Sequence, residues 1–74
     1  MEHYRVAAEL TPSELWWAYF ALGGNRTPDA VAAIVEGRAH PDRTDHDLLA
    51  LALNERFSEL GRDSRVPFFD QLEA

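Results

Sequence analysis

The pair Thr-Pro occurs twice in this 74-residue chain, and each copy carries the chemistry of a helix N-terminus. In "LTPSEL", Thr11 is a favourable N-cap, the following proline needs no backbone partner at the first helical position, and Glu14 completes a capping box. The glycine pair at residues 23–24 then supplies the left-handed backbone that ends a helix. These signals predict a helix over residues 12–22.

The same start and stop signals predict two more helices. Thr27 caps a helix over residues 28–36, and Thr44, with Asp47 three residues later as a weaker capping box, starts a helix over residues 45–60. A glycine follows each of these two helices, as is typical of helix ends.

The connections between the predicted helices are short, so neighbouring helices must pack against each other. The sequence therefore predicts an all-α fold, a small three-helix bundle formed by residues 11–61. Residues 1–10 are assigned to an N-terminal tail that either extends as a helix or stays loose. Residues 62–74 are predicted to pack back on the helices because they are too apolar for a solvated tail. Their apolar residues are Val66, Phe68, Phe69 and Leu72.

Composition limits the class of protein further. The chain has no cysteine for a disulfide or thiolate metal site, and 46% of its residues are hydrophobic, too many for an intrinsically disordered chain. Charged residues interrupt the first ten positions, which argues against a secretory signal. The longest uncharged run, residues 15–25, is shorter than the roughly 20 residues that cross a bilayer. We expect a cytoplasmic protein that does not enter a membrane.

The formal net charge is −6, from thirteen acidic residues and seven arginines. An acidic chain opposes the approach of phosphates, so a nucleic-acid partner is not expected, and an electrostatic partner is expected to be basic. The alternative is a helix-turn-helix-like nucleic-acid-binding protein, because "GGNR" joins two helices as in that motif. Its second helix would present Asp29, Ala32, Ala33 and Glu36, none of which donates a bidentate hydrogen bond to a base.

The stretch "ELWWAYFALGG" carries four aromatic rings within five positions. On a helical wheel, three of the rings fall in one arc of roughly 160° that is suited to a core, and Trp17 lies about 60° outside it. Trp17 is therefore either covered by the "VPFF" segment or exposed as an anchor for another chain. The residues of the core arc are Leu15, Trp16, Tyr19, Phe20 and Leu22.

The helix over residues 45–60 is also apolar on two sides. One stripe holds Leu49, Leu53, Phe57 and Leu60, whereas Leu48 and Leu51 lie roughly 100–160° away from its middle. We therefore expect some apolar surface to remain after folding, and predict a non-catalytic protein–protein interaction or regulatory module, with a protein partner or a homodimer. The predicted contact residues are Trp17, Leu48, Leu51, Phe68 and Phe69.

No motif for catalysis, a cofactor or a metal stands out. The chain lacks a cysteine nucleophile, a Gly-x-Ser-x-Gly turn and a glycine-rich phosphate loop, so no enzyme activity, catalytic residue or cofactor is expected. The acidic and histidine side chains near residues 40–47 fit neither the zinc-helix nor the calcium-loop spacing. These side chains are His40, Asp42, Asp45, His46 and Asp47.

Overall fold

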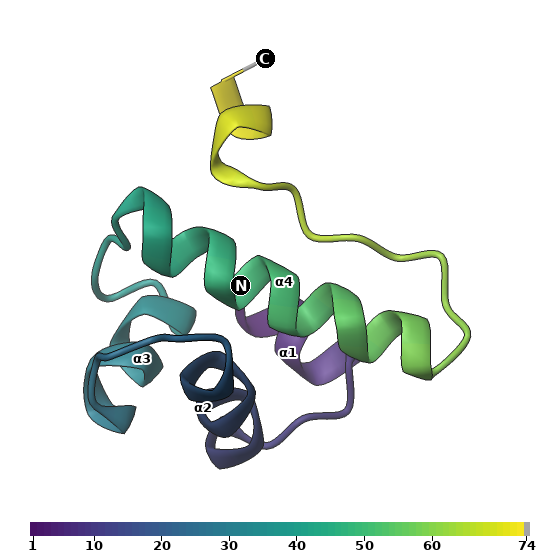
Figure 1. Cartoon of the computed structure of the whole chain (residues 1–74), viewed down its shortest axis with the longest axis horizontal. Helices are drawn as coiled ribbons and strands as arrows, with labels where there is room; N and C mark the ends of the chain where they lie inside the picture. The colour runs from purple at the N-terminus through teal and green to yellow at the C-terminus, as the bar shows by residue number, and fades with distance from the viewer. Residues whose placement is uncertain (74) are drawn as a thin grey trace.

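Helix α4 runs through the centre of the molecule, with α1, α2 and α3 on one side and the C-terminal segment on the other (Figure 1). The computed structural model describes residues 1–73, and these contain helices and no strand. The all-α three-helix bundle is confirmed, with a short fourth helix at the N-terminus. The elements in chain order are α1 (Glu2–Ala7), α2 (Pro12–Ala21), α3 (Pro28–Val35), α4 (Arg43–Glu59) and the 3-10 helix η1 (Phe69–Glu73).

The caps predicted for α2 and α3 are present. The Thr11 hydroxyl accepts a hydrogen bond from the Glu14 backbone N–H at 3.1 Å, and the Glu14 carboxylate accepts one from the Thr11 N–H at 2.8 Å. The Thr27 hydroxyl accepts from the Ala30 N–H at 3.1 Å. Gly23 ends α2 in the left-handed region, with φ of 103°. Local capping chemistry therefore fixes the limits of these two helices.

The start of α4 differs from the prediction. Asp42, not Thr44, is the N-cap, and its carboxylate accepts a hydrogen bond from the Asp45 backbone N–H at 2.8 Å. Helix α4 thus begins at Arg43, two residues before the predicted start. Aspartate caps at least as well as threonine, so two good caps two residues apart competed for this position, and the earlier one is used.

The predicted N-terminal tail, residues 1–10, takes the helical one of its two predicted alternatives and packs against the rest of the chain. It contains α1, whose N-cap Met1 makes no side-chain capping bond, which explains why no start signal marks the helix. Ala8 is fully buried, and the Arg56 side chain donates a hydrogen bond to its carbonyl oxygen at 3.1 Å. The Tyr4 and Leu10 side chains pack against the core.

The core lies between α2, α3 and α4. Its largest fully buried side chains come from α2 and α4, so the contact between these two helices is the centre of the hydrophobic interior. The buried apolar residues are Ala8, Leu15, Tyr19, Val31, Ile34, Val35, Leu49, Ala50, Ala52, Leu53, Phe57 and Val66.

The C-terminal segment packs back on α4, as predicted. Val66 is buried, and residues 62–68 run along α4 in the reverse direction, on the side away from α2 (Figure 1). This side is the wrong one for covering Trp17, so the interpretation in which the "VPFF" segment shields that ring is wrong. Ala74, the last residue of the predicted segment, lies outside the described residues.

No helix within residues 1–73 combines the length and the apolar character that a membrane span requires.

Candidate interaction surface

Helix α2 buries fewer of its rings than the helical wheel predicts. Tyr19 is fully buried, Trp16 is half-buried, and Phe20 is 50% exposed although the wheel placed all three in the core arc. Trp17 is 62% exposed. The reason is that α2 packs against its neighbours over a narrow arc centred on Leu15 and Tyr19, so the outer part of the predicted arc has no covering element.

The three rings outside this arc form one group, the α2 aromatic cluster, defined as Trp16, Trp17 and Phe20. The Trp16 ring stacks on Phe20 with 5.1 Å between centroids, and Trp17 lies edge-on to both, at 4.8 Å from Trp16 and 6.0 Å from Phe20. Offset and edge-to-face contacts of this kind restrict the rings before any partner binds. A surface that is already ordered loses less side-chain entropy on binding.

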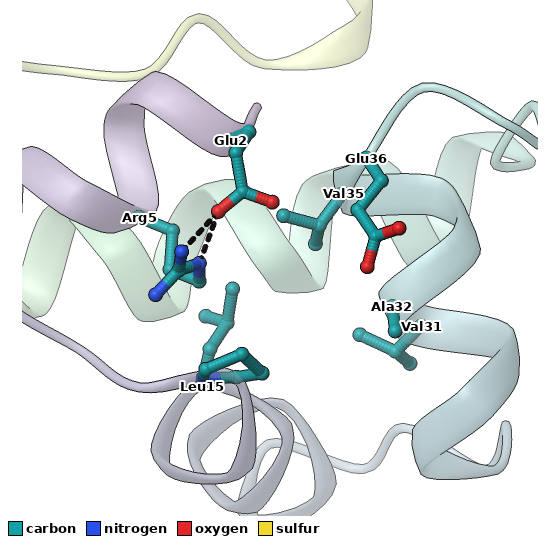
Figure 2. Close-up of a pocket in the computed structure, with 8 residues that line it drawn as sticks. Glu2, Arg5, Leu15, Val31, Ala32, Val35 and Glu36 are labelled. Carbon is teal, nitrogen blue, oxygen red and sulfur yellow. Dashed lines mark hydrogen bonds and ion pairs between the residues drawn. The ribbon is translucent and has the colours of Figure 1, made fainter.

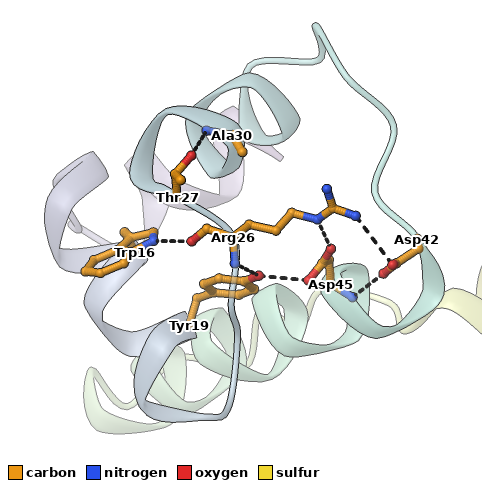
Figure 3. Close-up of polar contacts among 7 residues, drawn as sticks. All are labelled: Trp16, Tyr19, Arg26, Thr27, Ala30, Asp42 and Asp45. Carbon is orange, nitrogen blue, oxygen red and sulfur yellow. Dashed lines mark hydrogen bonds and ion pairs between the residues drawn. The ribbon is translucent and has the colours of Figure 1, made fainter.

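Trp16 anchors the cluster to the loop between α2 and α3. Its indole N–H donates a hydrogen bond to the Arg26 carbonyl oxygen at 2.9 Å (Figure 3). The same loop packs closely on Tyr19, since a Cβ atom at Gly24 would lie 2.3 Å from the Tyr19 ring. The loop and the cluster are therefore held in one fixed arrangement.

A polar network beneath this loop joins α2 to the start of α4 (Figure 3). The Tyr19 hydroxyl donates to the Asp45 carboxylate at 2.8 Å and accepts from the Arg26 backbone N–H at 3.1 Å. The Arg26 guanidinium pairs with the other Asp45 oxygen, and it also lies 3.5 Å from the Asp42 carboxylate. Asp45 is only 5% exposed, and its two oxygens are satisfied by these two partners.

The network shifts the pKa values of its members. Burial raises the pKa of Asp45, but hydrogen bonds from Arg26 and Tyr19 to the charged carboxylate outweigh burial, so the net pKa is below its ordinary value. Burial raises the pKa of the Tyr19 hydroxyl, and the hydrogen bond to Asp45 acts in the same direction. The Asp45 carboxylate raises the pKa of Arg26. All three shifts favour the ionised carboxylate, the neutral phenol and the charged guanidinium.

The other predicted contact residues do not join the α2 aromatic cluster. Leu48 is half-buried against the core, and Leu51 on α4 is 38% exposed. Phe69 is half-buried beside His46, with ring centroids 6.0 Å apart, and Phe68 is 36% exposed. The two phenylalanines belong to the C-terminal segment, on the side of α4 away from α2. The predicted residues therefore occupy separate surfaces.

The helical wheel assigned two members of the cluster, Trp16 and Phe20, to the core. Trp16 is half-buried, so the clear miss is Phe20, which is exposed. The helical-wheel position of Phe20 is compatible with the core and with the surface. The side chain is exposed because no other element of the structure covers it. Its spacing of three residues from Trp17 is the one signal in the sequence that the two rings share a surface.

One pocket, which lies between α1, α2 and α3, is too small for a ligand (Figure 2). It has about 20 Å³ of free space, which is room for about one water molecule. The Glu2–Arg5 ion pair and the Glu36 carboxylate lie at its rim, over a floor that includes Leu15 and Val35. Nor do residues 1–73 contain a group of histidine and acidic side chains placed to hold a metal ion.

The chain matches no protein-family model, and comparison with curated proteins and with solved structures gives no match.

Proposed function

We propose that the protein is a non-catalytic interaction module that binds another protein chain through the α2 aromatic cluster. The observation that carries this proposal is the ordered group of three large rings on one side of α2, of which Trp17 and Phe20 are exposed and Trp16 is half-buried. Tryptophan is enriched among the residues that dominate binding energy at protein interfaces, and exposed contiguous apolar patches mark such interfaces. The bound chain is either a second copy or a different protein.

The arginines support a protein partner over a nucleic acid. Each of the seven side chains already donates a hydrogen bond to a carboxylate, a hydroxyl or a carbonyl of this chain. Binding phosphates would require breaking these bonds in a chain whose net charge is −6.

The test compares Trp17→Ala with a matched surface variant, Val6→Ala. Val6 is 60% exposed on α1, so both changes remove an exposed apolar group. We expect both variants to keep the free energy of unfolding within about 1 kcal/mol of the wild type, because neither side chain fills the core. We expect only Trp17→Ala to lose binding of a hydrophobic dye, self-association in sedimentation, or retention of a protein from a native-host extract.

Two results would contradict the proposal. A loss of more than about 3 kcal/mol in Trp17→Ala would identify the ring as part of the core. A monomeric wild type that binds neither dye nor protein, at concentrations up to those of the sedimentation runs, would remove the interaction surface.

A further inference from the structure

The outward side of α4 holds the C-terminal segment by bonds to its backbone. Asn54 makes a reciprocal pair with Val66: its side-chain oxygen accepts from the Val66 N–H at 2.7 Å, and its side-chain amide donates to the Val66 carbonyl oxygen at 3.1 Å. This pairing satisfies both backbone groups of one residue, so it fixes the register of the segment on the helix.

Three more α4 side chains continue the contact. His46 Nε2 lies 2.9 Å from the Pro67 carbonyl oxygen, which only accepts, so this ring nitrogen carries the hydrogen and donates. The Asp47 carboxylate accepts from the Phe69 N–H at 2.8 Å. Arg43 pairs with Asp70 and lies over the Phe69 ring, 5.0 Å from its centroid. We call these four side chains (Arg43, His46, Asp47 and Asn54) the α4 tail site, and residues 66–73 the tail.

The tail is otherwise weakly attached. Val66 is its one buried apolar side chain, whereas Phe68 and Leu72 are 36% and 56% exposed. The linker over residues 62–65 is exposed and not helical. The specific contacts described above therefore hold the tail as they would hold a separate peptide, and the covalent link supplies proximity.

We propose that the α4 tail site also binds the tail of a second copy of this chain, giving a dimer in which two copies exchange their tails. The partner is set by the site itself, since a tail from another copy offers the same Val66 backbone groups, the same Phe69 ring and the same Asp70 charge. Exchange of an identical segment is a low-cost route to a two-fold dimer because every contact of the monomer is kept. This surface is separate from the α2 aromatic cluster.

The linker over residues 62–65 sets the balance between the monomer and the dimer with exchanged tails. In the monomer, a tail on a short linker faces its own site at an effective concentration on the order of millimolar, so the wild type exchanges tails only at comparable protein concentrations. The turn that sends the tail back begins at Gly61, whose φ is 71°. A change that disfavours this turn lowers the effective concentration of the tail at its own site. It leaves the contacts between tail and site in the dimer unchanged.

The first experiment removes residues 62–65 in a Trp17→Ala background, which prevents association through the α2 cluster. The four deleted residues supply up to about 14 Å of chain between Gly61 and Val66. Without them the tail cannot lie in its native position along its own α4. We expect the shortened protein to be a folded dimer by circular dichroism and sedimentation velocity, with a dissociation constant at least about tenfold below that of the full-length Trp17→Ala protein.

Two variants of the shortened protein identify the contact. Asn54→Ala damages the site and Val66→Asp damages the tail, so each alone is expected to be monomeric. An equimolar mixture contains one intact site–tail pair and is expected to form a heterodimer. Full-length Arg62→Ala is the control, because the deletion also removes the Arg62 contacts with Ala7 and Glu9, and it is expected to stay monomeric.

A folded monomer after the deletion overturns the proposal, and so does a dimer that persists in the Asn54→Ala variant. If the shortened protein does not fold, full-length Gly61→Ala provides the same test, because alanine disfavours the left-handed turn. Its dissociation constant is then expected to be lower than that of the full-length Trp17→Ala protein by about fivefold or more, and an equal value overturns the proposal. Since every protein in the series, including the Gly61 and Arg62 variants and the full-length reference, carries Trp17→Ala, these outcomes leave the proposed function of the α2 cluster untouched.

Discussion

Tyr19 belongs to the hydrophobic core and to the polar network at once. Its ring is fully buried against α4, while its hydroxyl links Asp45 to the Arg26 backbone. Removing the hydroxyl leaves a buried carboxylate with one partner fewer and a backbone N–H with none. We expect Tyr19→Phe to lower the free energy of unfolding by about 1–3 kcal/mol, measured by urea denaturation.

Tyr4→Phe is the matched control for this change. Tyr4 is half-buried against the core, and its hydroxyl makes no hydrogen bond among residues 1–73. Its loss is expected to change the free energy of unfolding by less than about 0.5 kcal/mol. Equal effects of the two substitutions would mean that the network adds nothing to stability.

The same network predicts how stability depends on pH. Hydrogen bonds lower the pKa of Asp45 in the folded chain despite its burial, and the backbone hydrogen bond from Thr11 lowers the pKa of Glu14. A carboxyl whose folded pKa is lowered stabilises the fold fully above its unfolded pKa, and this contribution is lost as the pH falls through the folded pKa. We expect the free energy of unfolding to decrease below about pH 4.

The variant Asp45→Asn separates the contributions of Asp45 and Glu14 to the pH dependence, because Glu14 is then the one of the two that keeps a lowered pKa. Urea denaturation at about pH 6, 4 and 3 should show a smaller decrease in the variant than in the wild type. Parallel decreases in the two proteins would assign the acid sensitivity to residues outside the network.

The sequence contained the members of this network but not their association. In the sequence, Asp45 is one of the acidic and histidine side chains near residues 40–47, and Arg26 belongs to the short connection "GGNR". The two are nineteen residues apart, and Tyr19 is twenty-six residues from Asp45. Helical periodicity predicts which residues share a face of one helix. It does not predict a contact that depends on how two helices and a loop pack together.

At the scale of the element, capping chemistry explains which helices the sequence predicts. Helices α2 and α3 carry threonine caps and were predicted to within one residue at each end. Helix α1 has no side-chain cap, and its six residues are held by packing against the rest of the chain, which a local signal does not report.

The N-terminus of α4 allows a direct test, since the sequence offers Asp42 and Thr44 as competing caps and the structure uses the first. We expect Asp42→Ala to lower the free energy of unfolding by about 1 kcal/mol, because the Asp45 backbone N–H loses its acceptor. Thr44→Ala, at an exposed position inside the helix, should change it by less than about 0.5 kcal/mol. The reverse order of the two effects, measured by thermal unfolding, would restore the predicted start at residue 45.

At the scale of the whole molecule, the sequence predicted that apolar groups outnumber buried positions but not where the excess lies. The helical wheel of α2 gave Phe20 a core position because it assumes cover over the whole apolar arc. In the structure, other elements bury α2 only near Leu15 and Tyr19, and the C-terminal segment lies on the opposite side of α4. The direction in which a terminal segment returns depends on its contacts with α4, and these involve single polar side chains such as Asn54 that carry no periodic signal.

Helix α4 therefore carries two sets of contacts, the polar network at its start and the tail site along its outward side. Asp45 and Asn54 are nine residues apart, or about 14 Å along the helix, and they share no partner. Sites at this separation contribute to stability independently. We expect the effects of Tyr19→Phe and Asn54→Ala on the free energy of unfolding to add within about 0.5 kcal/mol in the double variant.

Tyr19→Phe combined with Asp45→Ala gives the contrasting cycle, because these two side chains share a hydrogen bond of 2.8 Å. Their coupling energy is expected to be about 1 kcal/mol or more, since each single change already breaks the interaction that the other removes. Urea denaturation of both sets of variants at neutral pH measures the two coupling energies side by side. A large coupling between Tyr19 and Asn54 would show that the tail and the network stabilise one another through α4, so that exchange of the tail between copies would also alter the base on which the α2 aromatic cluster is held.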